Sequence, residues 1–374
     1  MKICILTSVH YPFDTRIFHK EAKSLLKAGY DVALIAQHDK DEIVEGIRIV
    51  PLPKPRNRIE RMTRTVWQVY RKALKIDADI YHFHDPELMP LGLLLKLQRK
   101  KVIYDIHENV PKQIKNKQWI YHWCRDIISK IICCVERFCL LGIPVIFAED
   151  SYRNDYFWIK QYTTVLNMPL INQLFYLKNV AQKTVGDSVG YIGGVSEERG
   201  SLVTIEALRI LKAQGVELRF ECVGPIEKSH ERQLFKLCGK YNLHNVVFHG
   251  RMLAYEGWPV IAQCDMGLAV LHPTPNYVES YPTKIFEYMA MGLPVIASNF
   301  KLYRKIVEGS ECGICVDPLD PEEISGAIRW IIEHPFEARR MGENGRRAVE
   351  EKYNWDKESE KLLALYRNLY NQRA

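Results

Sequence analysis

A chain of 374 residues has the length of two domains, each large enough to bury its own hydrophobic core. Its apolar runs fall short of the ~18 residues that cross a bilayer, and the apolar start at residues 1–8 lacks the cleavage pattern of a signal peptide. The net charge of +7 is accompanied by no stacking motif or nucleic-acid-binding fold, so nucleic acid is not expected as a partner.

Short apolar runs alternate with helical patterns along the chain, which predicts a parallel α/β architecture. In the first half we expect strands at residues 2–8, 30–36, 80–83, 101–106 and 143–147, and a helix at 14–28. In the second half we expect strands at residues 188–192, 217–223, 246–249, 266–270, 294–298 and 313–316, and helices at 201–214, 228–240 and 322–334. The pattern predicts two doubly wound, Rossmann-like domains, 1–175 and 185–352, followed by an amphipathic helix at 357–374.

The cysteines are scattered through apolar runs, which is typical of reduced core thiols in a cytoplasmic protein. Cys312 and Cys315 form the single Cys-x-x-Cys motif, and no second ligand pair follows them at the spacing of a zinc site. A redox or metal role for this pair is therefore the less favoured interpretation.

A polar segment from His10 to Arg16 closes the first expected strand and opens the first expected helix. Ligands of doubly wound sheets bind outside the carboxyl ends of the strands. We therefore expect His10, Asp14 and Arg16 to face a ligand-binding cleft, although Asp14 is equally suited to cap the helix.

Two segments combine basic residues with an apolar helical stripe. Residues 54–75 carry eight lysines or arginines against one acid, and residues 112–130 mix basic residues with Trp119, Trp123 and Ile127. Such helices can lie on an anionic membrane surface, at about 1 kcal/mol per basic residue. Alternatively, the apolar stripe packs on its own core while the charges face water. The sequence favours neither interpretation.

Histidines and acids end two neighbouring strands, as His82-Phe-His84-Asp85 and as Asp105-Ile-His107. A metal site is the less favoured interpretation, because zinc needs three or four converging ligands and these side chains lie on separate strands. We expect His107 to hydrogen-bond a ligand and Asp105 to support the structure; a core histidine without function is the alternative. The acids at positions 77 and 79 precede a strand at its amino end, which favours a solvated turn over a metal-binding Asp-x-Asp motif.

A glycine turn follows the first expected strand of the second half, with the sequence Gly193-Gly194-Val-Ser-Glu-Glu-Arg199-Gly200. Glycines at such a turn let backbone amides approach a phosphate, and a nearby arginine can bind its oxygens in a bidentate manner. A plain turn with a solvated arginine is the alternative.

The most informative stretch contains two glutamates eight positions apart, Glu279 and Glu287. Between them Pro282 suits the first turn of a helix, and Gly292 beyond them suits its left-handed end. An apolar run at 294–298 follows, which is typical of a buried parallel strand.

The start of this helix is an expected anion site. The free amides near Ser280, Tyr281 and Thr283 lie at the positive end of the helix dipole, and Lys284 adds a full charge. Glu287 lies three residues later on the same helical face, where it can bind a hydroxyl group. A nucleotide diphosphate has this combination of groups.

This Glu-x7-Glu pattern, with its enclosed Pro and Lys and its Ala-x-Gly-x-Pro-Val-Ile tail, resembles the donor-site signature of family-four retaining glycosyltransferases. The resemblance implies that Glu279 contacts the transferred sugar, that Glu287 binds the ribose hydroxyls and that Lys284 neutralises the diphosphate. It also implies that His107 lies near the transferred sugar and that Arg251 lies in a loop that touches the nucleotide base.

The resemblance further implies the GT-B fold, in which two Rossmann-like domains face a central cleft and the last helix packs back on the first domain. It places His10, Asp14, Arg16 and His84 on the acceptor side of that cleft. The family pattern Gly-Arg-x4-Lys-Gly is altered here, because Gly194 replaces the first basic residue and Arg199 replaces the second. Arg199 and Lys284 would then share the diphosphate, with Gly193 and Gly194 forming the turn beside it.

From these features we expect a metal-independent, retaining glycosyltransferase of the hexosyltransferase type, with no bound cofactor. Its donor is a UDP- or GDP-linked sugar, and its acceptor is a glycan or a lipid-linked glycan in surface polysaccharide synthesis of the bacterial type. The expected location is the cytoplasm, with the inner face of the cell membrane as a peripheral site. A non-catalytic sugar-nucleotide- or glycan-binding subunit and a GT-B-fold epimerase are the alternatives.

Overall fold

The computed structural model describes residues 1–374 except 117–120, 176, 178–186 and 372–374. The described chain divides into two compact units, Met1–Asn167 with Asp356–Ala374, and Met168–Trp355. The first boundary lies before the predicted position 175 because the residues from Met168 onward pack in the second unit. For example, the centre of the Phe175 ring lies 4.1 Å from the guanidinium carbon of Arg346 in the second unit.

The first unit is built around an eight-stranded sheet in the order β3-β4-β2-β1-β5-β6-β7-β8. Its strands are β1 (Lys2–Leu6), β2 (Asp31–Gln37), β3 (Glu42–Val44), β4 (Ile47–Leu52), β5 (Ile80–Phe83), β6 (Lys101–Ile106), β7 (Val145–Phe147) and β8 (Tyr162–Thr164). All neighbouring strands pair in parallel except β3 and β4, which form an antiparallel hairpin. Strands β5 and β7 are buried along their whole length, and β1 and β6 are buried except at their first residue, as expected for a sheet covered on both faces.

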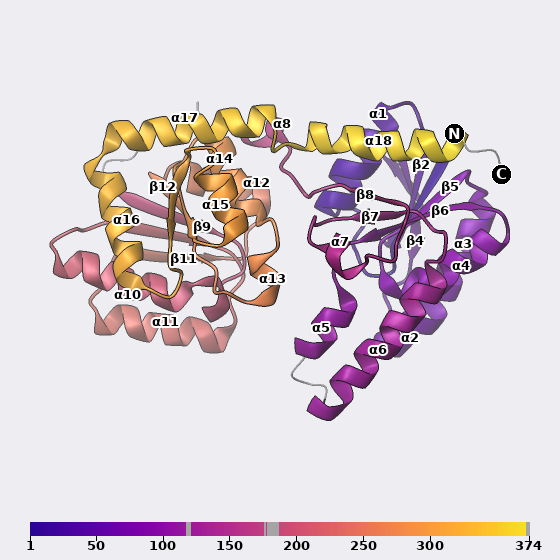
Figure 1. Ribbon diagram of the computed structural model, residues 1–374, viewed down its shortest axis with the longest axis horizontal. Helices are drawn as coiled ribbons and strands as arrows, with labels where there is room; N and C mark the ends of the chain where they lie inside the picture. Colours follow the sequence, from indigo (N-terminus) through magenta and orange to yellow (C-terminus); the bar gives the residue numbers. More distant parts are fainter. Residues whose placement is uncertain (117–120, 176, 178–186, 372–374) are drawn as a thin grey trace. The chain divides into compact units, whose positions relative to one another are not determined.

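Helices surround this sheet (Figure 1). They are η1 (Thr15–Ala22), α1 (Lys23–Lys27), α2 (Arg58–Glu60), η2 (Arg61–Thr65), α3 (Val66–Ile76), η3 (Pro86–Leu88), α4 (Met89–Leu97), α5 (Val110–Asn116), α6 (His122–Cys139), α7 (Tyr152–Asp155) and α18 (Trp355–Asn371). The helix predicted at 14–28 begins as the π-helix η1 and continues as α1. Asp14 caps it by accepting hydrogen bonds from the amides of Arg16 and Ile17 at 2.8 and 3.0 Å.

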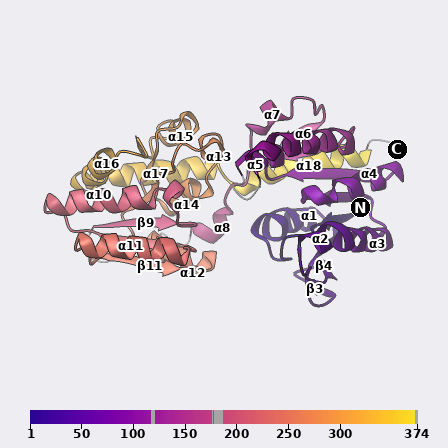
Figure 2. The same cartoon turned by 90° about the horizontal axis from the view of Figure 1, so that it is seen from below.

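The second unit contains a six-stranded, fully parallel sheet in the order β11-β10-β9-β12-β13-β14. Its strands are β9 (Ser188–Ile192), β10 (Arg219–Val223), β11 (Val246–Gly250), β12 (Met266–Ala269), β13 (Val295–Ser298) and β14 (Gly313–Val316). Its helices are α8 (Ile171–Leu174), η4 (Glu197–Arg199), α10 (Ser201–Ala213), α11 (Lys228–Lys240), α12 (Ala254–Ala262), α13 (Pro275–Val278), α14 (Thr283–Met291), α15 (Lys301–Val307), α16 (Pro321–Glu333) and α17 (Pro335–Glu351). Helices lie on both sides of β9 (Figure 2), which makes this unit doubly wound.

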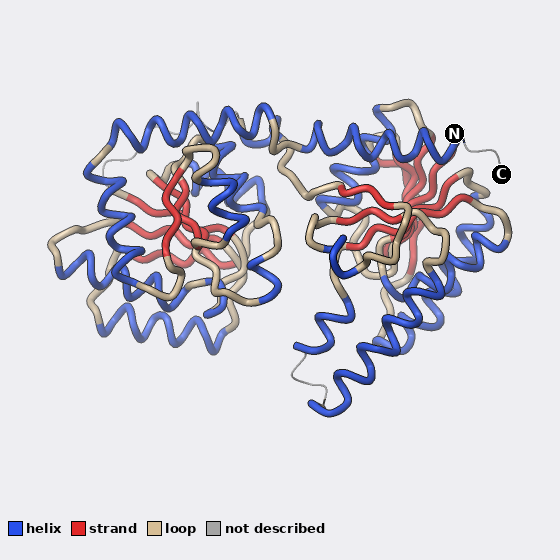
Figure 3. The backbone as a smooth tube through the Cα atoms, viewed as in Figure 1, coloured by secondary structure: helices blue, strands red, loops and turns tan. Residues whose placement is uncertain are grey.

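The strand order places β9 and β12 at the switch point of the second sheet, because β10 follows on one side of β9 and β13 on the far side of β12. Figure 3 shows the strands of each unit gathered at its centre, inside a layer of helices. In such sheets ligands bind beyond the carboxyl ends of the strands at the switch point. By this rule a ligand is expected to bind at the turn after Ile192 and at the start of α14.

The C-terminal helix α18 belongs to the first unit from Asp356 onward. Its Tyr366 hydroxyl lies 2.8 Å from Nδ1 of His82 on β5, and its Glu358 accepts a 2.9 Å hydrogen bond from the amide of Leu166. Both contacts are buried. The helix predicted at 357–374 therefore packs on the first sheet as far as it is described; its last residues, 372–374, lie outside the described part.

Candidate active site

Two glycine turns meet at the carboxyl ends of β9 and β10. Gly193 has a φ of +128° and Gly224 a φ of +153°, values that L side chains rarely adopt. A Cβ atom on Gly224 would lie 1.8 Å from the carbonyl oxygen of Gly193, so the two turns touch through bare backbone. A Cβ atom on Gly193 would lie 3.2 Å from Nζ of Lys284 and 3.6 Å from Nη1 of Arg199. The turn after β9 therefore lies directly beside both predicted diphosphate-binding cations.

Lys284 lies in the first turn of α14 and is 6% exposed. Its Nζ is 3.8 Å from the centre of the Tyr191 ring and has no hydrogen-bond partner among the described residues. Burial, together with the nearby charge of Arg199, lowers the pKa of Lys284 to about 7. A buried ammonium with three unused donors is costly without an anion, so this side chain is preorganised to bind one.

Arg199 ends η4 and is held by an aromatic neighbour. Its Nε donates a 3.1 Å hydrogen bond to the hydroxyl of Tyr277, and its guanidinium lies 5.6 Å from the centre of that ring. Gly194 stands beside the same guanidinium, since a Cβ atom there would lie 3.9 Å from the Arg199 Cζ. Arg199 therefore lies next to Gly194, the position at which the family pattern has its first basic residue.

Helix α14 is fixed against the sheet by the hydroxyl of Tyr288. This hydroxyl accepts a 3.0 Å hydrogen bond from the amide of Ile192 and donates a 3.1 Å hydrogen bond to the carbonyl of Leu268. Pro282 is the N-cap with extended backbone, and no side chain caps the helix; at its other end Gly292 has a φ of 74°. The first amides of α14 are therefore left for an anion beyond the carboxyl end of β9.

A cavity of about 260 Å³ lies at this junction. Its polar lining consists of Arg199, Thr283, Lys284 and Glu287 beside the glycine turns, and its apolar lining includes Met252, Leu253 and Trp258. The indole Nε1 of Trp258 is buried and has no hydrogen-bond partner among the described residues. The cavity combines two cations and a helix start with one carboxylate and an apolar wall, as a nucleotide diphosphate requires.

In the first unit, Asp85 ties the end of β5 to the end of β1. Its Oδ2 accepts hydrogen bonds from the Thr7 hydroxyl at 2.8 Å and from the Ser8 amide at 2.6 Å. These contacts explain why β1 ends at Leu6 and not at the predicted residue 8. His10 lies nearby, with Nε2 3.6 Å from Asp85 and Nδ1 3.5 Å from Asp14. A hydrogen bond with Asp14 raises the pKa of His10, despite partial burial.

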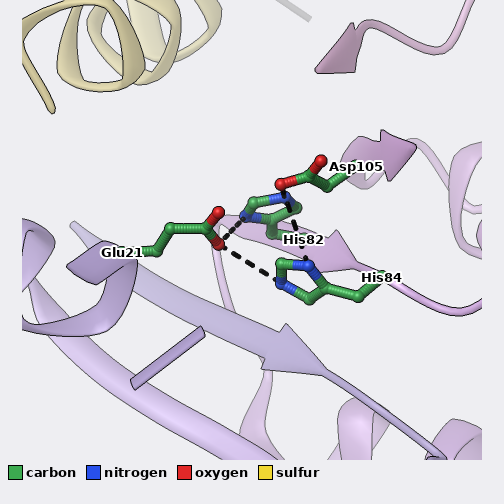
Figure 4. A group of neighbouring side chains, drawn as sticks. All are labelled: Glu21, His82, His84 and Asp105. Carbon is green, nitrogen blue, oxygen red and sulfur yellow. Dashed lines mark ion pairs between the residues drawn. The ribbon is translucent and has the colours of Figure 1, made fainter. Parts of the chain in front are cut away.

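Behind this rim lies a buried cluster made of Glu21, His82, His84 and Asp105 (Figure 4). The guanidinium of Arg16 lies between the two acids, with Nε 2.9 Å from Oε1 of Glu21 and Nη2 2.9 Å from Oδ2 of Asp105. These four side chains could offer ligand atoms within 4.8 Å of one another. However, Arg16 already supplies a fixed positive charge to both carboxylates, so a divalent cation would be added next to a guanidinium. Both carboxylate oxygens of Glu21 and Nε2 of His82 and of His84 have no hydrogen-bond partner among the described residues.

His107 connects this cluster to the surface. Its Nε2 lies 2.8 Å from Nδ1 of His84, and its side chain is 23% exposed. The hydroxyl of Tyr152 donates a 2.8 Å hydrogen bond to the backbone carbonyl of His107. These contacts hold His107 at the carboxyl end of β6, and its Nε2 is engaged by His84.

Two family models match the sequence, one described as Glycosyltransferase Family 4 over residues 15–138 and one as Glycosyl transferases group 1 over residues 178–348. The chain belongs to the family-four glycosyltransferases. Its fold is GT-B, since whole-chain structural matches accompany two Rossmann-like units. Sucrose-phosphate synthase from Thermosynechococcus elongatus matches 100% of both chains with a TM-score of 0.79 at 21% identity. HepE of Anabaena, solved in complex with UDP and glucose, matches 98% of this chain and 100% of its own with a TM-score of 0.73 at 15% identity.

Curated relatives of this family-four glycosyltransferase act on several sugars. The α-D-kanosaminyltransferase of Streptomyces kanamyceticus is 26% identical over 179 residues, which span 48% of this chain and 45% of that enzyme. The chain thus matches less than half the length of that relative. The D-rhamnosyltransferase WbpZ of Pseudomonas aeruginosa is 23% identical over 291 residues, 75% of this chain and 71% of that enzyme.

Of the predicted donor-binding residues, this glycosyltransferase brings Gly193, Arg199, Thr283, Lys284 and Glu287 to one cavity. The other predicted residues lie around it within the described second unit and are absent from its lining. Gly194 lies beside the guanidinium of Arg199, and Arg251 is exposed one residue before Met252 of the lining. Glu279 is exposed at the C-cap of α13, and Ser280 and Tyr281 are half-buried between it and α14.

Of the predicted acceptor-side residues, His10 and Asp14 are partly exposed, with side chains that are 35% and 30% accessible. Arg16 and His84 are buried, 4% and 3% exposed, so they support the site from behind. Sequence reasoning missed Glu21, because a glutamate on an amphipathic helix is normally solvated. It also missed the aromatic residues around the cations, Tyr191, Tyr277 and Trp258. Tyr191 could have been found from its place one residue before the end of β9.

Proposed function

We propose that this protein is a retaining, metal-independent hexosyltransferase that takes a sugar from a UDP- or GDP-linked donor. The supporting observation is the buried, unpartnered Nζ of Lys284 next to Arg199 and the start of α14 in one cavity. Departure of a nucleoside diphosphate leaves negative charge on the leaving group and positive charge on the sugar. Preorganised cations and helix amides stabilise that leaving group without a metal ion. HepE, a structural neighbour, was solved with UDP.

The sugar itself is assigned to other residues. By the family resemblance, Glu287 binds the ribose hydroxyls, Glu279 contacts the transferred sugar and His107 hydrogen-bonds its hydroxyls. Glu287 is the one carboxylate among the described residues that line the donor cavity. We therefore propose same-face attack by the acceptor hydroxyl, with the diphosphate leaving from that face, instead of a covalent glycosyl intermediate.

The acceptor is proposed to be a glycan or a lipid-linked glycan in surface polysaccharide synthesis. The names of two relatives support this assignment: a putative colanic acid glycosyltransferase of Salmonella typhimurium and a capsular polysaccharide glycosyltransferase of Staphylococcus aureus. WaaG, a structural neighbour, is described as a glycosyltransferase of lipopolysaccharide biosynthesis. Among the described residues, no helix combines the length and hydropathy that a bilayer crossing requires.

We propose that α6 rests on an anionic membrane surface at the cytoplasmic face. Its outward apolar side chains follow one another at intervals of three or four residues. They are Trp123, Ile127, Ile131, Val135, Phe138 and, just past the helix end, Leu141, all at least 42% exposed. Exposed Lys130 and Arg137 accompany them, and Asp126 is the exposed acid of the helix. The predicted Trp119 lies outside the described residues.

The other basic segment, 54–75, has a different arrangement. Val69 and Ala73 of α3 are fully buried in the core of the first unit, so the stripe at this end packs internally. Ile59 and Met62 at its beginning are 76% and 59% exposed. We therefore assign the lipid contact to α6 and treat α3 as a core helix with solvated charges.

The test of the transfer proposal is loss of activity when the donor cavity is altered. Lys284→Ala and Glu287→Ala should each lower the transfer rate by about tenfold or more, because each removes a group that binds the donor. Lys305→Ala on neighbouring α15, an exposed lysine, is the matched control and should retain normal activity. Rates are measured with a panel of UDP- and GDP-sugars and a lipid-linked acceptor extract.

Three outcomes would contradict this proposal. Near-normal transfer in both cavity variants would reject the site. Product formed from the donor alone, without acceptor, would indicate an epimerase. Nucleotide binding without turnover across the panel would indicate a non-catalytic binding subunit.

A further inference from the structure

The turn that carries Arg199 is joined to the segment that follows β12. A Cβ atom on Gly200 would collide with the carbonyl oxygen of Val270, so the two segments meet through bare backbone. Beside this contact, the amide of His272 donates a 2.9 Å hydrogen bond to the carbonyl oxygen of Glu198. Strands β9 and β12 are neighbours in the sheet, which brings the two segments together. The backbone on both sides of Arg199 is therefore held in place.

The side chain of Arg199 extends across this junction to Tyr277 on α13. Its Nε donates a 3.1 Å hydrogen bond to the Tyr277 hydroxyl, and its guanidinium carbon lies 5.6 Å from the centre of the ring. Tyr277 is itself anchored, because its backbone carbonyl accepts a 2.9 Å hydrogen bond from the hydroxyl of Tyr303. Tyr303 is 0% exposed. The group that accepts from Arg199 is thus fixed to the core of the second unit.

This contact decides which donors of Arg199 remain for a ligand. A guanidinium carries N–H donors on Nε and on both Nη nitrogens, in one planar fork. Because Nε is bonded to Tyr277, the end of the fork formed by Nη1 and Nη2 is the part that can bind two phosphate oxygens. Nη1 lies at the glycine turn, since a Cβ atom on Gly193 would be 3.6 Å from it. A lysine, with one ammonium group on a flexible stem, could not be oriented in this way.

We propose that Tyr277 is a positioning residue, which orients the guanidinium of Arg199 so that Nη1 and Nη2 face a phosphate group of the donor. The phosphate contact rests on the proposed function, whereas the orientation of the guanidinium does not. Gly194 stands at the first basic position of the family pattern, so a single oriented arginine serves where the pattern has two cations. An arginine that is oriented before binding loses less conformational freedom when the ligand arrives.

Three variants separate the orientation of Arg199 from a general structural effect. Tyr277→Phe removes the hydroxyl and keeps the ring, and Arg199→Met removes the guanidinium and keeps an unbranched side chain. Tyr241→Phe is the matched control, because the Tyr241 ring centre also lies 5.6 Å from the guanidinium carbon of an arginine, Arg209. Tyr241, at the end of α11, does not line the donor cavity.

The functional test is calorimetric titration of UDP, GDP and inorganic pyrophosphate into the full-length protein. Tyr277→Phe should weaken the affinity for pyrophosphate and for the bound nucleotide by the same factor, about fivefold or more, because the lost hydrogen bond orients a charged group. Tyr241→Phe should stay within about twofold of wild type. In the Arg199→Met background, adding Tyr277→Phe should change the affinity by less than about twofold, since a residue that acts through another has no effect once that other is removed.

The orientation is measured without any ligand from the Nε–H signal of Arg199 in nitrogen-15 NMR, with Arg199→Met used to assign it. A hydrogen-bonded N–H exchanges slowly with water. We expect a slowly exchanging signal in the wild type and in Tyr241→Phe, and a faster-exchanging signal in Tyr277→Phe.

An Nε–H signal that is the same in Tyr277→Phe and in the wild type would overturn the proposal, and so would additive effects in the double variant. If the double variant does not fold, the spectra of the wild type and of Tyr277→Phe still decide the orientation. A wild-type protein that gives the expected spectra but binds none of the three probes would reject the proposed function and, with it, the phosphate contact of Arg199. The two failures are therefore distinguishable.

Discussion

At the scale of single residues, the site depends on Lys284 being buried before any ligand arrives. Its ammonium lies over the Tyr191 ring, beside Arg199 and without a hydrogen-bond partner among the described residues. Burial of this ammonium without a partner lowers the free energy of unfolding of the ligand-free protein. Because the unfolded chain has the ordinary lysine pKa of 10.5 and the folded chain one of about 7, the unfolded state binds more protons between these values. Stability of the free protein should therefore rise with pH across that window.

The lowered pKa of Lys284 predicts that binding of a nucleoside diphosphate is coupled to proton uptake. A bound diphosphate favours the charged ammonium, so binding above pH 7 takes up a proton. The affinity for a nucleoside diphosphate should weaken with rising pH between about 7.5 and 9, by at most tenfold per pH unit. Calorimetry in buffers of different ionisation enthalpy measures this uptake directly. In Lys284→Met the uptake should vanish and the residual affinity should be lower and independent of pH; uptake that persists in this variant would assign the proton to another group.

At the scale of elements, the helix that carries the site was predictable because its signals are local. Pro282, Gly292 and the apolar run after them specify where α14 begins and ends, and the helix is found at Thr283–Met291. The strand after it begins at Val295 and not at the predicted Pro294, since proline cannot donate to the ladder. The hairpin β3–β4 was not predicted, although its turn residues Glu45 and Gly46 both have positive φ, as a tight hairpin requires.

The grouping of the buried cluster in the first unit was beyond sequence reasoning. Arg16 and Glu21 come from η1, His82 and His84 from β5 and its end, and Asp105 from β6. Their contacts depend on the lateral order and register of strands, which the sequence pattern does not specify. The donor cavity was easier to predict, because Gly193, Arg199 and Lys284 each belong to a local strand-to-helix motif with its own chemical signature.

Helix α6 presents an exposed apolar face. Ile127→Asp and Phe138→Asp place charges on its exposed apolar face and should abolish flotation with anionic liposomes without changing transfer to a soluble acceptor. Phe336→Asp on α17, at an exposed apolar residue of the other unit, is the control and should float like wild type. Wild-type flotation should weaken between ~0.05 and ~0.5 M salt as charges are screened.

Two outcomes would reject the lipid assignment for α6. One is that both α6 variants float with liposomes to the same extent as the wild type. The other is a wild-type protein that stays unbound and forms a dimer that the same substitutions dissociate, as measured by light scattering. The second result would assign the apolar face to contact between copies of the chain.

At the scale of the whole molecule, each unit brings its own contribution to the ends of its parallel strands. The second unit presents two cations and a helix start in one cavity, and the first presents His107 beside the buried cluster of Glu21, His82, His84 and Asp105. Family membership and the GT-B fold follow from the comparisons, while the donor, the stereochemistry and the independence from metal are our proposals. In these proposals, side chains and amides of the second unit bind the diphosphate without a metal ion.

The most direct test is calorimetric titration of UDP and GDP into metal-stripped protein with excess chelator. We expect at least one nucleotide to bind at micromolar concentrations, with an affinity that is unchanged when Mg²⁺ or Mn²⁺ replaces the chelator and is lost in Lys284→Ala. Binding that appears only with a divalent cation, or that is equal in wild type and Lys284→Ala, would contradict it.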